Sequence, residues 1–195
     1  MNLIMVSDIF GKTAALNQLA AQLSIFYERV VVIDPYGGQS ICFNTEENAY
    51  QYFQQNCGLK KLTELLESAI ERSKETIDII GFSIGGTSAW EISGKDISTS
   101  IRNIVCFYGS RIREKTDISP HFSTSLVFPT LEKSFDLEPV ILAVENKDNV
   151  EVIRTNYFHG FMNRESKNFS ETGYKYFIHW LVKKAVHPTN QPDGK

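Results

Sequence analysis

The chain has 195 residues, of which 42% are hydrophobic and 22% charged, and its formal net charge is −3. This length suits one domain with a single substantial core, and an acidic balance with dispersed Lys and Arg argues against a nucleic acid partner. Three widely spaced cysteines favour free thiols over a zinc site, and no apolar run approaches the roughly 20 residues that cross a bilayer, so we expect a cytoplasmic protein without a membrane partner or a metal.

The first part of the chain predicts a strand, a helix and a second strand. Residues 2–7 are a continuous apolar run, which is typical of a buried parallel strand, and residues 30–33 form another. Gly11-Lys12-Thr13 resembles the end of a phosphate-binding loop, but the glycine that this motif needs five residues earlier is Val6, so we discard a nucleotide site. The helix between the strands is predicted from Leu16, Leu19, Ala20 and Leu23.

The alternation continues through the middle of the chain. Residues 39–58 show no clear pattern, and residues 62–70 then carry apolar side chains at helical spacing. Strands are predicted at residues 77–80 and 104–107. Strands that alternate with helices indicate an open, mostly parallel sheet with helices on both faces, which is a three-layer α/β/α sandwich.

The segment from Gly81 to Gly85 carries the clearest chemical signal. An apolar strand leads into Gly81-Phe82-Ser83-Ile84-Gly85 and a helix follows, which is the context of a G-x-S-x-G nucleophile elbow. The two glycines allow strand and helix to approach closely, while the serine takes a strained backbone conformation that exposes its Oγ. We therefore predict that Ser83 is a nucleophile, which requires a base, an acid and an oxyanion hole.

Two interpretations of residues 125–153 are open. If residues 139–144 are a strand, Asp148 follows it as the obvious triad acid, but the very short link to the next strand forces an antiparallel hairpin. If residues 125–128 are the strand and residues 137–144 a helix, the next strand becomes a sixth parallel strand with a right-handed crossover. We prefer the second interpretation because it obeys the crossover rule.

The preferred interpretation selects the acid. Glu132 then lies just past the end of a strand and faces the nucleophile, whereas Asp148 lies at the start of the next strand, at the opposite edge of the sheet. Asp136 is a third candidate. We predict Glu132, which would hold the imidazole of the base in its correct tautomer.

The base is predicted to be His159. It follows the last strand, and it completes the chain order Ser, acid, His that is found in the α/β-hydrolases. His179 falls inside a final helix that Ser170 caps, and His187 ends the expected domain of residues 1–187, before a flexible tail at residues 188–195. His121 lies in a loop and is a possible site contact.

The oxyanion hole is expected to consist of backbone amides. One is the N–H of Ile84, directly after the nucleophile, and the other comes from the loop after the first strand, from Ile9 or Phe10. Further side chains expected to line the site are Asp8, Phe10, Tyr36, Phe82, Tyr108, Arg111, His121 and Phe161.

Five segments in a fixed order resemble the dienelactone hydrolase family of small α/β-hydrolases. The resemblance spans Met1 to about Lys184 and implies a minimal fold without a lid domain, a loop after the first strand that supplies an oxyanion amide, and hydrolysis of carboxylic esters without a cofactor. The segments are Val6-Ser7-Asp8-Ile9-Phe10-Gly11, Asp34-Pro35-Tyr36, Gly81-Phe82-Ser83-Ile84-Gly85-Gly86, Phe107-Tyr108-Gly109 and Tyr157-Phe158-His159-Gly160-Phe161.

Two departures from the family pattern limit what the resemblance implies. The namesakes use a cysteine and a glutamate where this chain has Ser83 and Asp8, so the control of a thiol by that carboxylate does not carry over. They also bind the carboxylate of the substrate with arginines, and Arg164 is displaced by one position from the expected place after His159. Dienelactone itself is therefore not the expected substrate.

These observations together predict a serine hydrolase with a Ser83-His159-Glu132 triad that cleaves a small carboxylic ester or thioester through an acyl-enzyme. Two alternatives remain open: a catalytically silent scaffold that binds a small ligand or a partner, and an acyltransferase or peptidase on the same triad. A monomer or weak dimer is expected.

Overall fold

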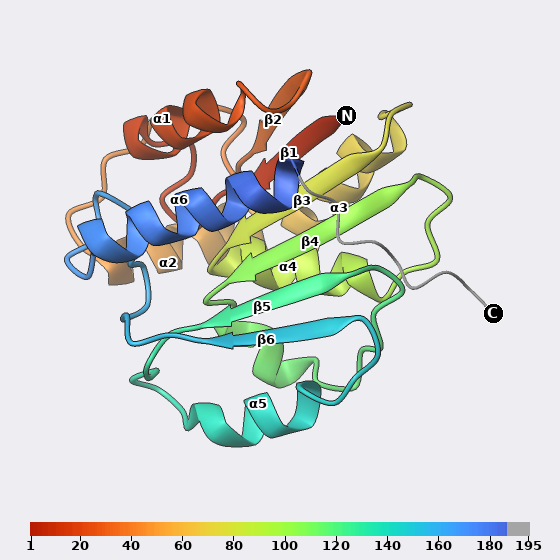
Figure 1. The fold of residues 1–195 in the computed structure, drawn as a ribbon. Helices are drawn as coiled ribbons and strands as arrows, with labels where there is room; N and C mark the ends of the chain where they lie inside the picture. The colour runs from red at the N-terminus through yellow and green to blue at the C-terminus, as the bar shows by residue number, and fades with distance from the viewer. Residues whose placement is uncertain (187–195) are drawn as a thin grey trace.

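The structure is a computed structural model that describes residues 1–186. It is built around a six-stranded parallel sheet (Figure 1). The strand order is β2-β1-β3-β4-β5-β6, and all five neighbouring pairs are parallel. The predicted α/β sheet is thus confirmed, with no antiparallel pair among the described strands. The strands are β1 (Asn2–Val6), β2 (Arg29–Ile33), β3 (Ile77–Phe82), β4 (Ile101–Phe107), β5 (Thr124–Phe128) and β6 (Val150–Arg154).

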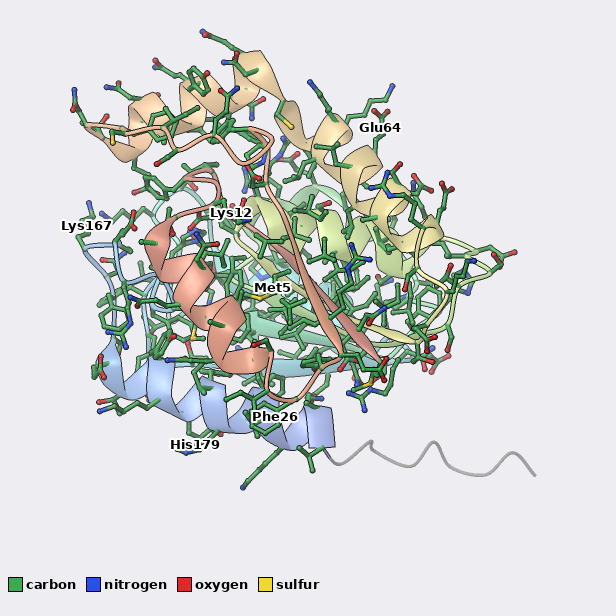
Figure 2. All side chains as sticks on the ribbon, turned by 90° about the horizontal axis from the view of Figure 1, so that it is seen from above. Met5, Lys12, Phe26, Glu64, Lys167 and His179 are labelled. Atoms are coloured by element: carbon green, nitrogen blue, oxygen red, sulfur yellow. The ribbon has the colours of Figure 1, made fainter. Side chains whose placement is uncertain are left out.

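Helices cover both faces of this sheet and complete the predicted three layers. Helices α1 and α6 pack on one face, and α2 to α5 pack on the other, as Figures 1 and 2 show from two directions. The helices are α1 (Ala14–Leu23), α2 (Glu46–Asn56), α3 (Gly58–Glu71), α4 (Ile84–Ser93), α5 (Leu137–Val144) and α6 (Glu171–Val186), with a 3₁₀ helix η1 (Ser110–Glu114). None of the helices within residues 1–186 has the length and apolar character needed to cross a bilayer.

The apolar strands divide the core into two layers. Successive side chains of a strand point to opposite faces, so Leu3 and Met5 pack beneath α1 and α6, while Ile4 and Val6 pack toward α3 and α4. Both faces are covered, which explains why the central strands are mostly apolar, with their polar residues Asp78, Arg102 and Asn103 near the amino ends of β3 and β4. Met5 lies deep between the helical layers in Figure 2.

The segment after β5 follows the preferred interpretation. Helix α5 has Asp136 as its N-cap, whose carboxylate accepts from the N–H of Glu138 at 3.1 Å. Strand β6 pairs in parallel with β5, and Thr124 lies opposite Val150. The hairpin interpretation is therefore wrong, because residues 139–144 belong to a helix.

Two elements within the described residues were not predicted. Helix α2 lies in the segment that showed no pattern, because only Ala49 and Phe53 of its eleven residues are buried. The short helix η1 follows β4 and brings two arginines to the same edge of the sheet as Ser83. The predicted domain end at residue 187 and the tail at residues 188–195 lie outside the described residues.

Candidate active site

The backbone of Ser83 is strained at the junction of β3 and α4. Its φ of 52° and ψ of −113° lie outside the regions that L-residues prefer. The neighbouring glycines are required by close backbone contacts: a Cβ on Gly81 would lie 2.2 Å from the carbonyl oxygen of Gly85, and one on Gly85 would lie 2.4 Å from that of Ser7. The sharp turn leaves Ser83 in the cleft at the carboxyl edge of the sheet.

Three side chains from three loops form a hydrogen-bonded row. The Oγ of Ser83 lies 2.9 Å from Nε2 of His159, and Nδ1 of His159 lies 2.6 Å from Oε1 of Glu132. Glu132 follows β5 and has a side chain that is only 10% exposed, and His159 follows β6. Because a carboxylate accepts hydrogen bonds only, Glu132 requires the proton on Nδ1 and leaves Nε2 as an acceptor for the hydroxyl of Ser83.

The other candidate acids lie elsewhere. Asp136 caps helix α5 through the N–H of Glu138. Asp148 is exposed in the turn before β6, at the amino end of that strand and so at the sheet edge opposite Ser83. The parallel crossover of α5 is the physical reason for this placement.

Two backbone amides beside Ser83 remain available as donors. Within residues 1–186, neither the N–H of Ile84, the first residue of α4, nor the N–H of Ile9 donates a hydrogen bond. The N–H of Phe10 is already donated to the carboxylate of Asp8 at 2.9 Å. Of the two amides expected from this loop, that of Ile9 is therefore the available one, and the positive end of α4 adds to the same electrostatic field.

An open cleft of about 870 Å³ surrounds the row of side chains. Its apolar wall includes Phe10 and Phe43, and its mouth carries the half-exposed side chains of Leu131 and Phe158. Charged side chains of both signs also line it: Arg111, Arg113, Lys133, Lys167, Glu46, Glu47 and Glu165. The arginines of η1 are partly engaged by Glu114, which accepts from Arg111 at 2.7 Å.

Half of the side chains expected to line the site do so. Asp8, Phe10, Tyr108 and Arg111 face the cleft. Tyr108 directly follows β4 with a φ of 41°, and its ring centroid lies 4.9 Å from that of His159. Burial raises the pKa of its phenol well above the usual value.

The other expected lining residues belong to the core or to another edge. Phe82 stacks on Phe107 with ring centroids 5.3 Å apart, because a strand residue beside Ser83 points into the layer of α1 and α6. Phe161 is fully buried in the same layer. Tyr36 lies behind the cleft, where its hydroxyl donates to the carbonyl oxygen of Ile9 at 2.6 Å.

His121 was also expected near the site, and this placement is wrong. Its N–H donates to the carbonyl oxygen of Ser93 at 2.7 Å, next to the C-terminal end of α4 and just before β5 begins. The loop after η1 thus returns to the amino edge of the sheet. The loop of residues 109–124 was expected to be able to supply a carboxylate-binding arginine such as Arg111 or Arg113, and both line the cleft. Sequence reasoning missed Lys133 and Asn163, although each follows the carboxyl end of a strand, where ligand sites of parallel sheets lie.

The carboxyl group of Asp8 has an unusual environment on the floor of the cleft. Burial raises its pKa to about 6, against the lowering effect of hydrogen bonds from the N–H of Phe10 and the amide of Asn163. His159 lies close enough to lower this pKa, and Glu165 to raise it.

Sequence comparison identifies a relative from Bacillus subtilis (strain 168). No protein-family model matches the chain. The uncharacterized protein YczH is 28% identical over 171 residues, which cover 86% of this chain and 83% of that protein.

Solved structures share the fold across nearly the whole chain. A protein assigned as a dienelactone hydrolase from Klebsiella pneumoniae subsp. pneumoniae MGH 78578 matches with a TM-score of 0.75 and 14% identity, over 95% of this chain and 86% of that one. Dienelactone hydrolase from Anabaena variabilis ATCC 29413 matches with a TM-score of 0.64 and 15% identity, over 97% and 86% of the two chains. The resemblance found in the sequence is thus confirmed for the fold, which is that of the dienelactone hydrolases.

Proposed function

We propose that this chain is a serine hydrolase of the dienelactone hydrolase type that cleaves a small carboxylic ester or thioester. The observation that carries the proposal is the continuous row from the Oγ of Ser83 through His159 to Glu132, with contacts of 2.9 and 2.6 Å. The shared fold supports it, because α/β-hydrolases carry their nucleophile at this strand-to-helix turn.

The arrangement assigns one step to each group. Nε2 of His159 takes the proton of the Ser83 hydroxyl while Oγ attacks the carbonyl carbon of the substrate. The amides of Ile84 and Ile9 stabilise the oxyanion of the tetrahedral intermediate, and Glu132 stabilises the imidazolium ion. His159 then returns the proton to the leaving alkoxide or thiolate, and a water molecule activated by the same base hydrolyses the acyl-enzyme.

The cleft supports a small substrate with an apolar portion. Its volume of about 870 Å³ falls within the range of ordinary small-molecule sites. The apolar side chains of Phe10, Phe43 and Leu131 offer a surface for an acyl or alcohol group, while the mouth stays open to water, which is the acceptor in hydrolysis.

A fluorophosphonate probe tests the nucleophile and its base. We expect one probe per chain, attached to Ser83, and no labelling in Ser83→Ala or His159→Ala. His121→Ala is the matched histidine control, because this side chain lies at the opposite edge of the sheet, and it should label at the wild-type rate. Labelling at another residue, or none in folded protein, contradicts the proposal.

A panel of esters and thioesters of graded acyl length, with wild type and Ser83→Ala, then tests the reaction. Turnover that Ser83→Ala loses supports hydrolysis. A labelled protein that turns over no member of the panel favours the silent scaffold. Products formed with added alcohols or amines in place of water favour an acyltransferase, since acceptor access decides the fate of an acyl-enzyme.

A further inference from the structure

The carboxylate of Asp8 joins two loops that lie far apart in the sequence. Its Oδ1 accepts from the N–H of Phe10 at 2.9 Å, within the loop after β1. Its Oδ2 accepts from Nδ2 of Asn163 at 2.9 Å, four residues after His159. The loop that carries the Ile9 amide is thus tied to the loop that carries the base.

The orientation of the Asn163 side chain is fixed by its own contacts. Its Oδ1 accepts from the N–H of Glu165 at 2.9 Å, so its Nδ2 must be the group that faces Asp8. The backbone N–H of Asn163 donates to the carbonyl oxygen of Gly160 at 2.9 Å. Position 8 therefore needs a side chain with two oxygens that each accept a hydrogen bond, and a carboxylate meets this need.

The peptide group between Asp8 and Ile9 is held from its carbonyl end. That carbonyl oxygen accepts from the hydroxyl of Ser7 at 3.0 Å and from the N–H of Gly11 at 3.2 Å. Because a peptide group is planar and trans, fixing its C=O also fixes the direction of the Ile9 N–H. The hydroxyl of Tyr36 holds the next carbonyl oxygen, that of Ile9.

Asp8 makes no contact with the nucleophile within hydrogen-bonding distance among the described residues. Both of its oxygens are used by Phe10 and Asn163, and the hydroxyl of Ser83 is bonded to His159. The side chain therefore acts on the loop beside it.

We propose that Asp8 and Asn163 form a clamp that fixes the N–H of Ile9 as the second oxyanion donor, so that both are positioning residues. This Asp8–Asn163 clamp rests on the proposed function, because an oxyanion donor matters only if Ser83 makes a tetrahedral intermediate. Misdirecting one such donor costs on the order of 100-fold in rate and leaves ground-state binding nearly unchanged.

A reciprocal exchange of the two side chains tests the clamp. Asp8→Asn sets two amide donors against each other, and Asn163→Asp sets two carboxylates against each other, so each single change breaks the contact. The double change Asp8→Asn/Asn163→Asp restores it with donor and acceptor reversed, and position 8 still accepts from Phe10 while position 163 still accepts from Glu165.

The measurements are the rate of fluorophosphonate labelling at Ser83 and, with an ester that is turned over, kcat and KM. We expect each single change to slow labelling and kcat by about 100-fold with KM within about threefold, and the double change to recover to within about tenfold of wild type. Asn149→Asp, the same substitution at the opposite edge, should keep the wild-type values, and thermal unfolding verifies that each variant is folded.

Four outcomes contradict the clamp, and the last of them also overturns the proposed function. If wild type labels normally and the single variants match it, the clamp is wrong and the function stands. The same conclusion follows if the double variant is folded and as slow as the single variants, or if only KM changes. If folded wild type is not labelled at all, the proposed function fails and the clamp with it.

Discussion

Polar groups at the two ends of β3, which lie at opposite edges of the sheet, have different environments. Near the amino end, the carboxylate of Asp78 is 4% exposed and accepts hydrogen bonds from Arg102, Tyr27 and Asn103. Arg102 also donates to the carbonyl oxygen of Ala185 at the end of α6. The charges of Asp78 and Arg102 are thus paired, and the network links β3 and β4 to the end of α6.

The carboxyl end of β3 is built differently. Ser83 and Tyr108 hold strained, positive φ angles, and the amides of Ile9 and Ile84 donate to no group within residues 1–186. Asp8 and Glu132 border an open cleft. At the amino edge a positive φ occurs at Asn149, but asparagine tolerates the left-handed region. Strained residues of other types together with unsatisfied donors cost stability, so their presence beside the cleft indicates function, whereas the satisfied network around Asp78 indicates a structural role.

The largest effect that separates the two edges is expected from the acid of the triad. Glu132→Gln keeps the size of the side chain, but its amide nitrogen can set the wrong tautomer of His159, so we expect kcat to fall by roughly 10³-fold or more. Steady-state kinetics and labelling of Ser83 measure this loss. Asp148→Asn is the matched control at the amino edge, and a loss there with an unchanged Glu132→Gln would reverse our assignment.

This contrast between acids also shows how far sequence reasoning reached. Strand and helix periodicity, with the rule that parallel strands need a long crossover, placed Glu132 beside the base and Asp148 at the far edge. The same reasoning failed for Phe82 and Phe161, which are next to motif residues along the chain but point into the core. The direction in which a side chain points at the end of a strand depends on the pleat and on packing, and the spacing of motifs gives no information about either.

The loops that line the cleft were not predicted, for a related reason. Lys133 lines the cleft from the loop between β5 and α5, and no local pattern encodes the path of that loop. Helix α2 was missed because it buries little apolar surface, so its periodicity is weak. The sheet was predictable because its strands are buried on both faces. The cleft was not predictable, since loops form it.

An intermediate effect is expected at the amino edge, on stability. Arg102→Met leaves the buried carboxylate of Asp78 without its bidentate partner, so we expect the free energy of unfolding to fall by about 3 kcal/mol, as for other broken buried pairs. Urea unfolding followed by circular dichroism measures the change. The kcat of the folded variant should stay at the wild-type value, since this network does not touch the cleft.

Two controls sharpen this prediction. Lys95→Met removes the half-exposed pair with Glu67 and should cost at most about 1 kcal/mol. The double change Asp78→Asn/Arg102→Met removes both charges and should recover part of the lost stability. A folded Arg102→Met protein with normal stability and a reduced kcat would show that the two edges are coupled and that the comparison is wrong.

The smallest effect concerns pH and distinguishes the carboxylates of the two edges. The pKa of Asp8 is raised to about 6 by burial, under the influence of His159 and Glu165, with the phenol of Tyr108 uncharged nearby. The ionised form accepts from both Phe10 and Asn163, so the clamp is complete above this pKa and is lost as the pH falls through it. At pH 5 about one tenth of Asp8 remains ionised, which predicts a tenfold loss of kcat in wild type that Asp8→Asn does not share. The ratio of kcat in wild type to kcat in Asp8→Asn should therefore fall by about tenfold from pH 7 to pH 5, measured on protein shown to be folded by circular dichroism. A ratio that does not change with pH would mean that protonation of Asp8 does not open the clamp, and that this carboxylate is as purely structural as Asp78.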